Sequence, residues 1–186
     1  RMGWIDVIPE VPAIKVKGQS RGAFSLAEYK TLVKKARSMV GWQHPDGQES
    51  LRKHMRLRYG DNTLPMDLQW AMRLLVHGFM RPSDLKNLKH QHVQMVQSGT
   101  HTYLRLTLPE SKGHGTPIVT MPAAVQLYRH IQKQRPAQSA PGDYLLLPHI
   151  KDREHALKVL SFHFNWVLSQ TGLKQSPTGT QRTLYS

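Results

Sequence analysis

The most informative segment for predicting the fold is Gly78-Phe79-Met80-Arg81-Pro82-Ser83-Asp84-Leu85-Lys86-Asn87-Leu88. Gly78 interrupts an apolar helical pattern, and Pro82 is typical of a new helix start because proline fits the first turn of a helix. We therefore expect one helix to end near Gly78 and a short helix, carrying Leu85 and Leu88, to follow. Arg81 would lie at the junction between the two helices.

Three helices are predicted before this junction. Ser25 and Glu28 form a capping box, which predicts a helix that starts there and runs to Gly41. A second helix is expected over residues 49–59, and a third after Pro65. The expected buried stripe of the third helix consists of Leu68, Ala71, Met72, Leu75 and Phe79.

The sequence after the junction changes to strand patterns. Segments 93–96, 102–109 and 116–121 alternate in polarity or are rich in β-branched residues, and turn residues separate them, including Lys112 in the second turn. They predict a three-stranded antiparallel meander. Two helices, over 122–134 and 156–168, should complete a mainly α, α+β fold.

The charge of the chain is strongly positive. Lys and Arg number 26 against 12 Asp and Glu, so the formal net charge is +14, and apolar residues make up 39% of the chain, which is typical of a globular protein. Residues 1–60 carry 12 basic and 5 acidic side chains, residues 121–186 carry 8 and 3, and the centre is nearly balanced. Clustered Lys and Arg favour a nucleic-acid partner. A basic solubilising surface is the alternative.

The densest basic patch lies in the helix expected over 49–59. At helical spacing Arg52 and Arg56 share one face with Lys53 beside them, while Leu51 and Tyr59 point the other way. These three cations are candidate DNA contacts, although the solvated face of a core helix would have the same pattern.

The organisation of the chain is simple. Residues 1–24 are rich in Pro and Gly and read as a linker or arm, and residues 25–186 read as one domain. No stretch approaches the roughly 18 apolar residues of a membrane span. The absence of cysteine excludes a disulfide framework, a cysteine nucleophile and a Cys-ligated metal site.

Three segments of this pattern together resemble a known family. The first is the stretch around Arg81, and the second is the strand-turn-strand segment 108–122 around Lys112. The third is the terminal Gln181-Arg182-Thr183-Leu184-Tyr185-Ser186, which is similar to the approach to a His- or Tyr-x-x-Arg motif with Tyr185 in its first position. In this order the segments resemble the catalytic domain of the tyrosine recombinases, the phage integrase family.

The resemblance implies a function and a set of roles. It implies site-specific DNA recombination or integration by strand cleavage and rejoining through a 3′-phosphotyrosine intermediate, with no cofactor and no metal. Arg81 would bind the scissile phosphate and Lys112 would act as general acid. The partners would be double-stranded DNA and, in the full-length protein, further copies on DNA; a cytoplasmic, bacterial or phage-encoded protein is expected. By position alone, Arg81 would more often be a capping or ion-pair arginine, and Lys112 a solvent-facing turn lysine.

The sequence also departs from the family pattern. The arginine after Tyr185, a further His or Trp, and the nucleophilic tyrosine would all lie past Ser186, so we expect 25–186 to be the larger N-terminal part of the domain and to be inactive alone. Tyr185 is not expected to be the nucleophile. The alternatives are a non-catalytic DNA-binding protein of the same fold and, less favoured, a basic RNA-binding protein.

Further residues near Arg81 are secondary candidates. Lys86, Lys89 and His90 could contact phosphates. Asp84 could orient Arg81 or stabilise the short helix through its dipole, of which the structural role is favoured. The pair His90 and His92 has metal-ligand chemistry, but no third ligand lies near it in the sequence, so no metal site is predicted.

Overall fold

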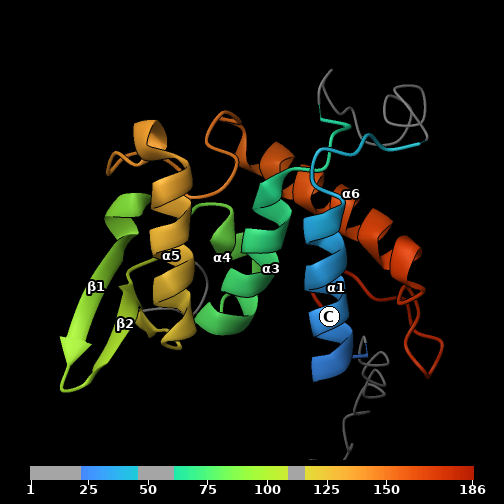
Figure 1. The fold of residues 1–186 in the computed structure, drawn as a ribbon, viewed down its shortest axis with the longest axis horizontal. Coiled ribbons are helices and arrows are strands. Elements are labelled where there is room, and N and C mark those ends of the chain that lie inside the picture. The colour runs from blue at the N-terminus through green and yellow to red at the C-terminus, as the bar shows by residue number, and fades with distance from the viewer. Residues whose placement is uncertain (1–21, 46–60, 109–115) are drawn as a thin grey trace, which may run out of the picture.

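A computed structural model describes residues 22–45, 61–108 and 116–186 of the chain. Its central element is α3, Met66–Gly78, a helix whose side chains are mostly buried. Three other helices pack against it: α1 (Leu26–Ser38), α5 (Ala123–Gln134) and α6 (Arg153–Thr171). Figure 1 shows α5 and α1 on either side of α3, with α6 crossing behind α1.

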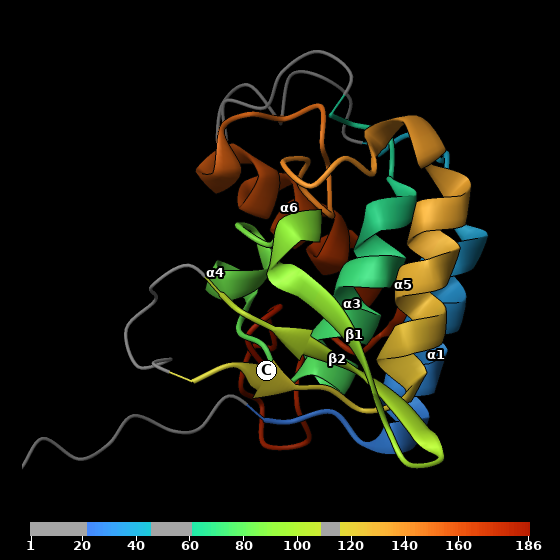
Figure 2. The ribbon, with the colours of Figure 1, turned by 90° about the vertical axis from the view of Figure 1, so that its left-hand side faces the viewer.

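A small antiparallel sheet lies at one side of the helices, next to α5 (Figure 2). Its strands are β1 (Val93–Ser98), β2 (His101–Leu106) and β3 (Ile118–Val119), in the order β1-β2-β3. The pairing puts Val93 opposite Leu106 and Arg105 opposite Val119. The predicted mainly α, α+β fold with a three-stranded antiparallel sheet is therefore confirmed.

Strand β3 is shorter than the segment 116–121 that the sequence predicted. The reason lies at Thr120, whose side-chain oxygen accepts the backbone N–H of Leu104 at 3.1 Å. A side chain thus replaces the backbone carbonyl that would continue the ladder. The chain then turns away, and the Met121 N–H donates to the carbonyl of His77 at 2.8 Å.

Caps set the ends of the helices. In α1 the Ser25 Oγ accepts the Glu28 N–H at 3.2 Å and the Glu28 carboxylate accepts the Ser25 N–H at 2.7 Å, so the predicted capping box is confirmed. Helix α6 starts three residues before its expected start, because the Asp152 carboxylate caps it by accepting the His155 N–H. The first turn of α6 is polar, so the sequence shows no apolar periodicity from which this earlier start could be predicted.

The expected burial of Phe79 is wrong. Helix α3 ends at Gly78, and Phe79 adopts a left-handed conformation with φ of 52° and is 63% exposed. The residue after the last helical turn no longer follows the helical period, so its side chain leaves the buried stripe.

The described part of the chain also contains three short elements. They are the helix α4 (Pro82–Leu85) and two 3-10 helices, η1 (His90–His92) and η2 (Pro136–Gln138). The helix predicted over 49–59 with Arg52, Lys53 and Arg56, the turn with Lys112, and the arm before Gly22 lie outside the described residues. In the three described ranges, no helix is both long enough and apolar enough to cross a bilayer.

A buried ion pair joins three separate parts of the fold. Asp67, in the first turn of α3, is 1% exposed, and its carboxylate accepts two bonds from the Arg135 guanidinium at 2.7 and 2.5 Å. The same carboxylate accepts the Leu147 backbone N–H at 2.7 Å. Arg135 in turn lies 4.8 Å from the centre of the Trp70 ring. The start of α3, the end of α5 and the loop before α6 therefore share one anchor.

We expect Asp67→Ala to lower the free energy of unfolding by about 3 kcal/mol or more, because it leaves a half-buried guanidinium and a buried N–H without their acceptor. Urea unfolding at pH 7 measures this. The matched control is Glu154→Ala, whose exposed side chain pairs with Lys86 and should contribute about 1 kcal/mol or less. Equal losses in the two variants would contradict the account of the anchor.

Candidate phosphate-binding site

Arg81 lies where α3 gives way to α4. Its backbone is held on both sides: its N–H donates to the Asp84 carboxylate at 3.4 Å, and its carbonyl accepts the N–H groups of Asp84 and Leu85, each at 3.0 Å. Asp84 is 4% exposed. Asp84 therefore fixes the backbone from which the Arg81 side chain extends.

The Arg81 side chain is exposed. Within the described ranges its guanidinium forms no hydrogen bond or ion pair. An arginine that capped the helix or neutralised a carboxylate would have such a partner. The five N–H donors of this side chain are therefore open to a ligand, and a planar guanidinium matches two oxygens of a phosphate at once.

The turn before Arg81 depends on a close approach of the chain to itself. A Cβ added to Gly78 would lie 2.9 Å from the Met80 side-chain methyl and 3.7 Å from a methyl of Leu106. Met80, which is buried, thus folds back over the end of α3. A larger residue at position 78 would have to displace the Met80 methyl group, which packs between the end of α3 and strand β2.

The base of the β2–β3 connection is attached to the same end of α3. Leu106 of β2 lies against Gly78, and the residue after Thr120 is hydrogen-bonded to His77. The two ends of the connection that contains Lys112 therefore start from the region that carries Arg81. Lys112 itself lies in the connection, outside the described residues.

The remaining candidates near Arg81 have partners within the protein. The Lys86 ammonium forms an ion pair with Glu154, and its side chain is 13% exposed. The Lys89 ammonium lies 4.9 Å from the centre of the Tyr144 ring. His90 is 6% exposed, and its Nδ1 lies 3.1 Å from the Tyr128 hydroxyl. A phosphate contact by His90 would require this buried pair to open.

Burial also acts on the charge of the two neighbouring histidines. Burial lowers the pKa of His90, although the charge of Asp143 acts to raise it. Burial also lowers the pKa of His92, and the charge of Lys89 lowers it further. The neutral form of both is favoured at pH 7. In the part of the chain that the structure describes, no three His, Asp or Glu side chains gather as a metal site would require.

No sequence pattern predicted the role of Arg182. This residue is 3% exposed, and its guanidinium donates to the Glu28 carboxylate at 2.9 and 3.3 Å. It also donates to the carbonyls of Gly22 and Ala23 and lies 4.7 Å from the Phe24 ring centre. The C-terminal segment is therefore attached to the start of α1, a contact across more than 150 residues that no local pattern reveals.

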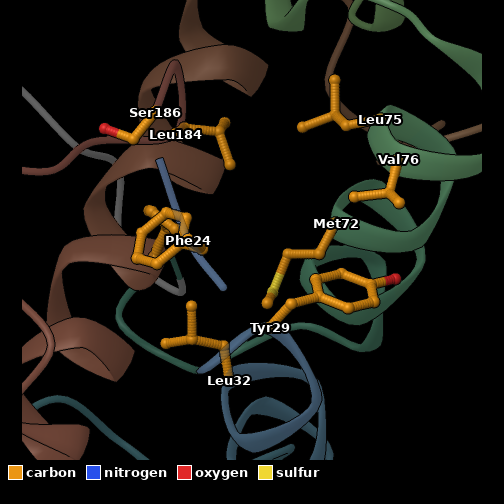
Figure 3. Close-up of a pocket in the computed structure, with 9 residues that line it drawn as sticks. Phe24, Tyr29, Leu32, Met72, Leu75, Val76, Leu184 and Ser186 are labelled. Carbon is orange, nitrogen blue, oxygen red and sulfur yellow. The ribbon is translucent and has the colours of Figure 1, made fainter. Parts of the chain in front are cut away.

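This attachment places the last residues beside an apolar pocket of about 70 Å³ between α1, α3 and α6 (Figure 3). Phe24 and Leu184 form one wall, and Met72 and Val76 of α3 lie across from them. Tyr185 is 50% exposed, and its backbone N–H donates to the Thr183 hydroxyl. The terminal segment 181–186 therefore lies beside the start of α1 and this pocket.

Comparisons of the chain with protein-family models, with curated proteins and with solved structures found no match.

The attachment at Glu28 predicts a pH-dependent stability. The Ser25 backbone N–H, and after it the Arg182 guanidinium, hold the pKa of the Glu28 carboxyl below its ordinary value of 4.5. Because the folded pKa is lowered, the stabilisation is present above pH 4.5 and is lost as the pH falls through the folded pKa. We expect Glu28→Gln to be less stable than the parent chain at pH 7 and to approach it near pH 3.

Urea unfolding of both chains at the two pH values tests this. Glu154→Gln is the control, because its exposed carboxylate should make a small difference at either pH. If Glu28→Gln lowers the free energy of unfolding by the same amount at pH 7 and at pH 3, the carboxylate charge does not stabilise the attachment.

Proposed function

We propose that this protein binds duplex DNA and that Arg81 contacts a backbone phosphate in a domain that cleaves and rejoins DNA through a 3′-phosphotyrosine intermediate. The observation that carries the proposal is Arg81 itself, an exposed guanidinium without a partner among the described residues, on a backbone fixed by Asp84. The net charge of +14 supports a polyanionic partner. The resemblance of three segments to the tyrosine recombinases supplies the reaction.

The geometry at Arg81 suits charge stabilisation at phosphorus. When a tyrosine oxygen attacks the phosphodiester, the P–O5′ bond breaks and negative charge grows on the nonbridging oxygens. A guanidinium that donates to both of these oxygens stabilises the transition state more than the ground state. Because the Arg81 backbone is already held in place, the ordering that phosphate binding requires here is that of the side chain.

The leaving 5′ oxygen needs a proton as the bond breaks. In this proposal the Lys112 ammonium donates it, a role that rests on the resemblance alone. The attachment of the ends of its connection to His77 and Gly78 is consistent with that role. A lysine in a turn between two strands can act as general acid when the turn reaches the phosphate.

DNA binding without cleavage is the second candidate. It is favoured by Arg182, the basic residue nearest to Tyr185 in the sequence, because the Arg182 guanidinium is occupied by Glu28 and by two backbone carbonyls. If Tyr185 attacked a phosphate, the Arg182 guanidinium would not be free to bind that phosphate.

Replacement of Arg81 tests the phosphate contact. We expect Arg81→Ala to reduce the slope of log K against log[salt] for a mixed-sequence duplex by about 0.9, which corresponds to one phosphate contact, while Arg81→Lys retains most of the slope. Fluorescence anisotropy at several salt concentrations measures it. The control is Arg129→Ala, an exposed arginine on α5. Equal slopes for Arg81→Ala and the parent chain would remove Arg81 from the DNA-binding site.

A suicide DNA substrate tests the assignment of Tyr185. We expect the 186-residue chain to form no phosphotyrosine-linked adduct, because Tyr185 is not the expected nucleophile and Arg182 beside it is committed to Glu28. Denaturing gels and peptide mapping detect such an adduct. An adduct at Tyr185 would overturn this assignment and would also exclude binding without cleavage.

A further inference from the structure

A basic groove of about 460 Å³ lies between α1 and α3, away from Arg81. Helix α1 contributes Lys30, Lys34 and Arg37 to its lining, and α3 contributes Arg73 and His77. Figures 1 and 2 both show α3 between α1 and α4, so the groove and the start of α4 flank α3 on different sides. The groove and the Arg81 junction therefore lie on different sides of α3, although His77 of the groove lies close in sequence to the junction.

Within the described residues, the charges in the groove are not balanced by carboxylates. No acidic side chain is among the described residues that line it, and in the described ranges Lys30, Lys34, Arg37 and Arg73 form no ion pair. Lys30 and Lys34 are one helical turn apart, an arrangement of like charges that destabilises a helix. An anionic ligand would relieve this repulsion.

The floor of the groove is partly shielded from water. Burial lowers the pKa of His77, and the charge of Arg73 lowers it further. The buried Nδ1 of His77 has no hydrogen-bond partner within the described residues. Burial also raises the pKa of Tyr29, against the effect of Arg73. His77 is thus mainly neutral at pH 7, and the charge of Arg73 acts in surroundings where solvent screens it less.

We propose that this groove binds the phosphate backbone of duplex DNA without reading its sequence. It would be a second contact surface, in addition to Arg81. The inference rests on the proposed DNA-binding function and deepens it. Lys30 and Arg37 are about 10 Å apart along α1, since a helix rises 1.5 Å per residue. One DNA strand carries a phosphate about every 3.4 Å along the duplex axis, so a duplex lying parallel to α1 would bring roughly three phosphates of one strand within this length.

The lining favours a duplex over other polyanions. A single strand would need aromatic side chains on which bases stack, and Tyr29 is the one aromatic ring among the described residues of the lining besides the imidazole of His77. Lys and Arg side chains along an open groove are what phosphate neutralisation requires.

The test removes three charges from the groove and compares three equivalent charges elsewhere. The groove variant is Lys34→Gln with Arg37→Gln and Arg73→Gln. The control variant is Lys133→Gln with Lys151→Gln and Lys158→Gln, which are exposed and do not line the groove. Each purified chain is titrated with a mixed-sequence duplex at 50–200 mM salt, and far-UV circular dichroism with urea unfolding verifies that each is folded.

We expect the groove variant to reduce the salt slope by about 2.7, so that the parent chain loses roughly 40-fold more affinity than the variant between 50 and 200 mM salt. The salt slope of the control variant should differ from that of the parent chain by about one unit or less. The single variant Lys34→Gln, at an exposed position, should reduce the slope by about 0.9 even if the triple variant does not fold.

The outcomes separate the two proposals. A groove effect together with no effect of Arg81→Ala would retain the groove and reject the Arg81 contact. The reverse result would reject the groove, as would equal slope changes in the groove and control variants. If the groove variant binds DNA normally but no longer binds a polyglutamate peptide, the groove is a protein-docking surface and the proposal is overturned.

Discussion

The Asp67 carboxylate is the contact on which the arrangement of the described helices depends. It is buried at the start of α3, and it holds the end of α5 through Arg135 and the loop before α6 through the Leu147 N–H. A buried carboxylate is tolerated only when its acceptor positions are filled, so this contact selects one packing of three elements. With α3 fixed at its start, the position of its other end, and hence of Arg81, is fixed as well.

Local signals predicted most of the fold, and long-range contacts account for what they missed. The capping box at Ser25 and Pro82 after Arg81 act within one helical turn, which is why the sequence reveals them. The partners of Asp67 and Arg182 lie far away in the chain, and only the fold brings them together. Phe79 shows the opposite case: the apolar period included it, but the left-handed turn after Gly78 removes it from the core.

The same limit applies to the candidate site. The sequence singled out Arg81 by motif and the basic patches by composition, but it could not show which cations have partners. The structure divides them: Lys86, Arg135 and Arg182 pair with carboxylates, whereas Arg81 and the cations of the α1–α3 groove do not within the described residues. His90 looked like its lysine neighbours in the sequence, yet it is buried against Tyr128. The pairing of each cation within the fold is therefore information that charge density in the sequence does not contain.

The most direct test of the account is a measurement on the Arg81 guanidinium itself. In an NMR spectrum of the arginine Nε–Hε groups, with the Arg81 signal assigned from Arg81→Lys, a duplex added at low salt should shift this signal and slow its exchange with water. Added salt should reverse both effects, because the contact is to phosphate. An Arg81 signal that stays unchanged while the duplex is bound would contradict the central claim that this residue contacts the DNA backbone.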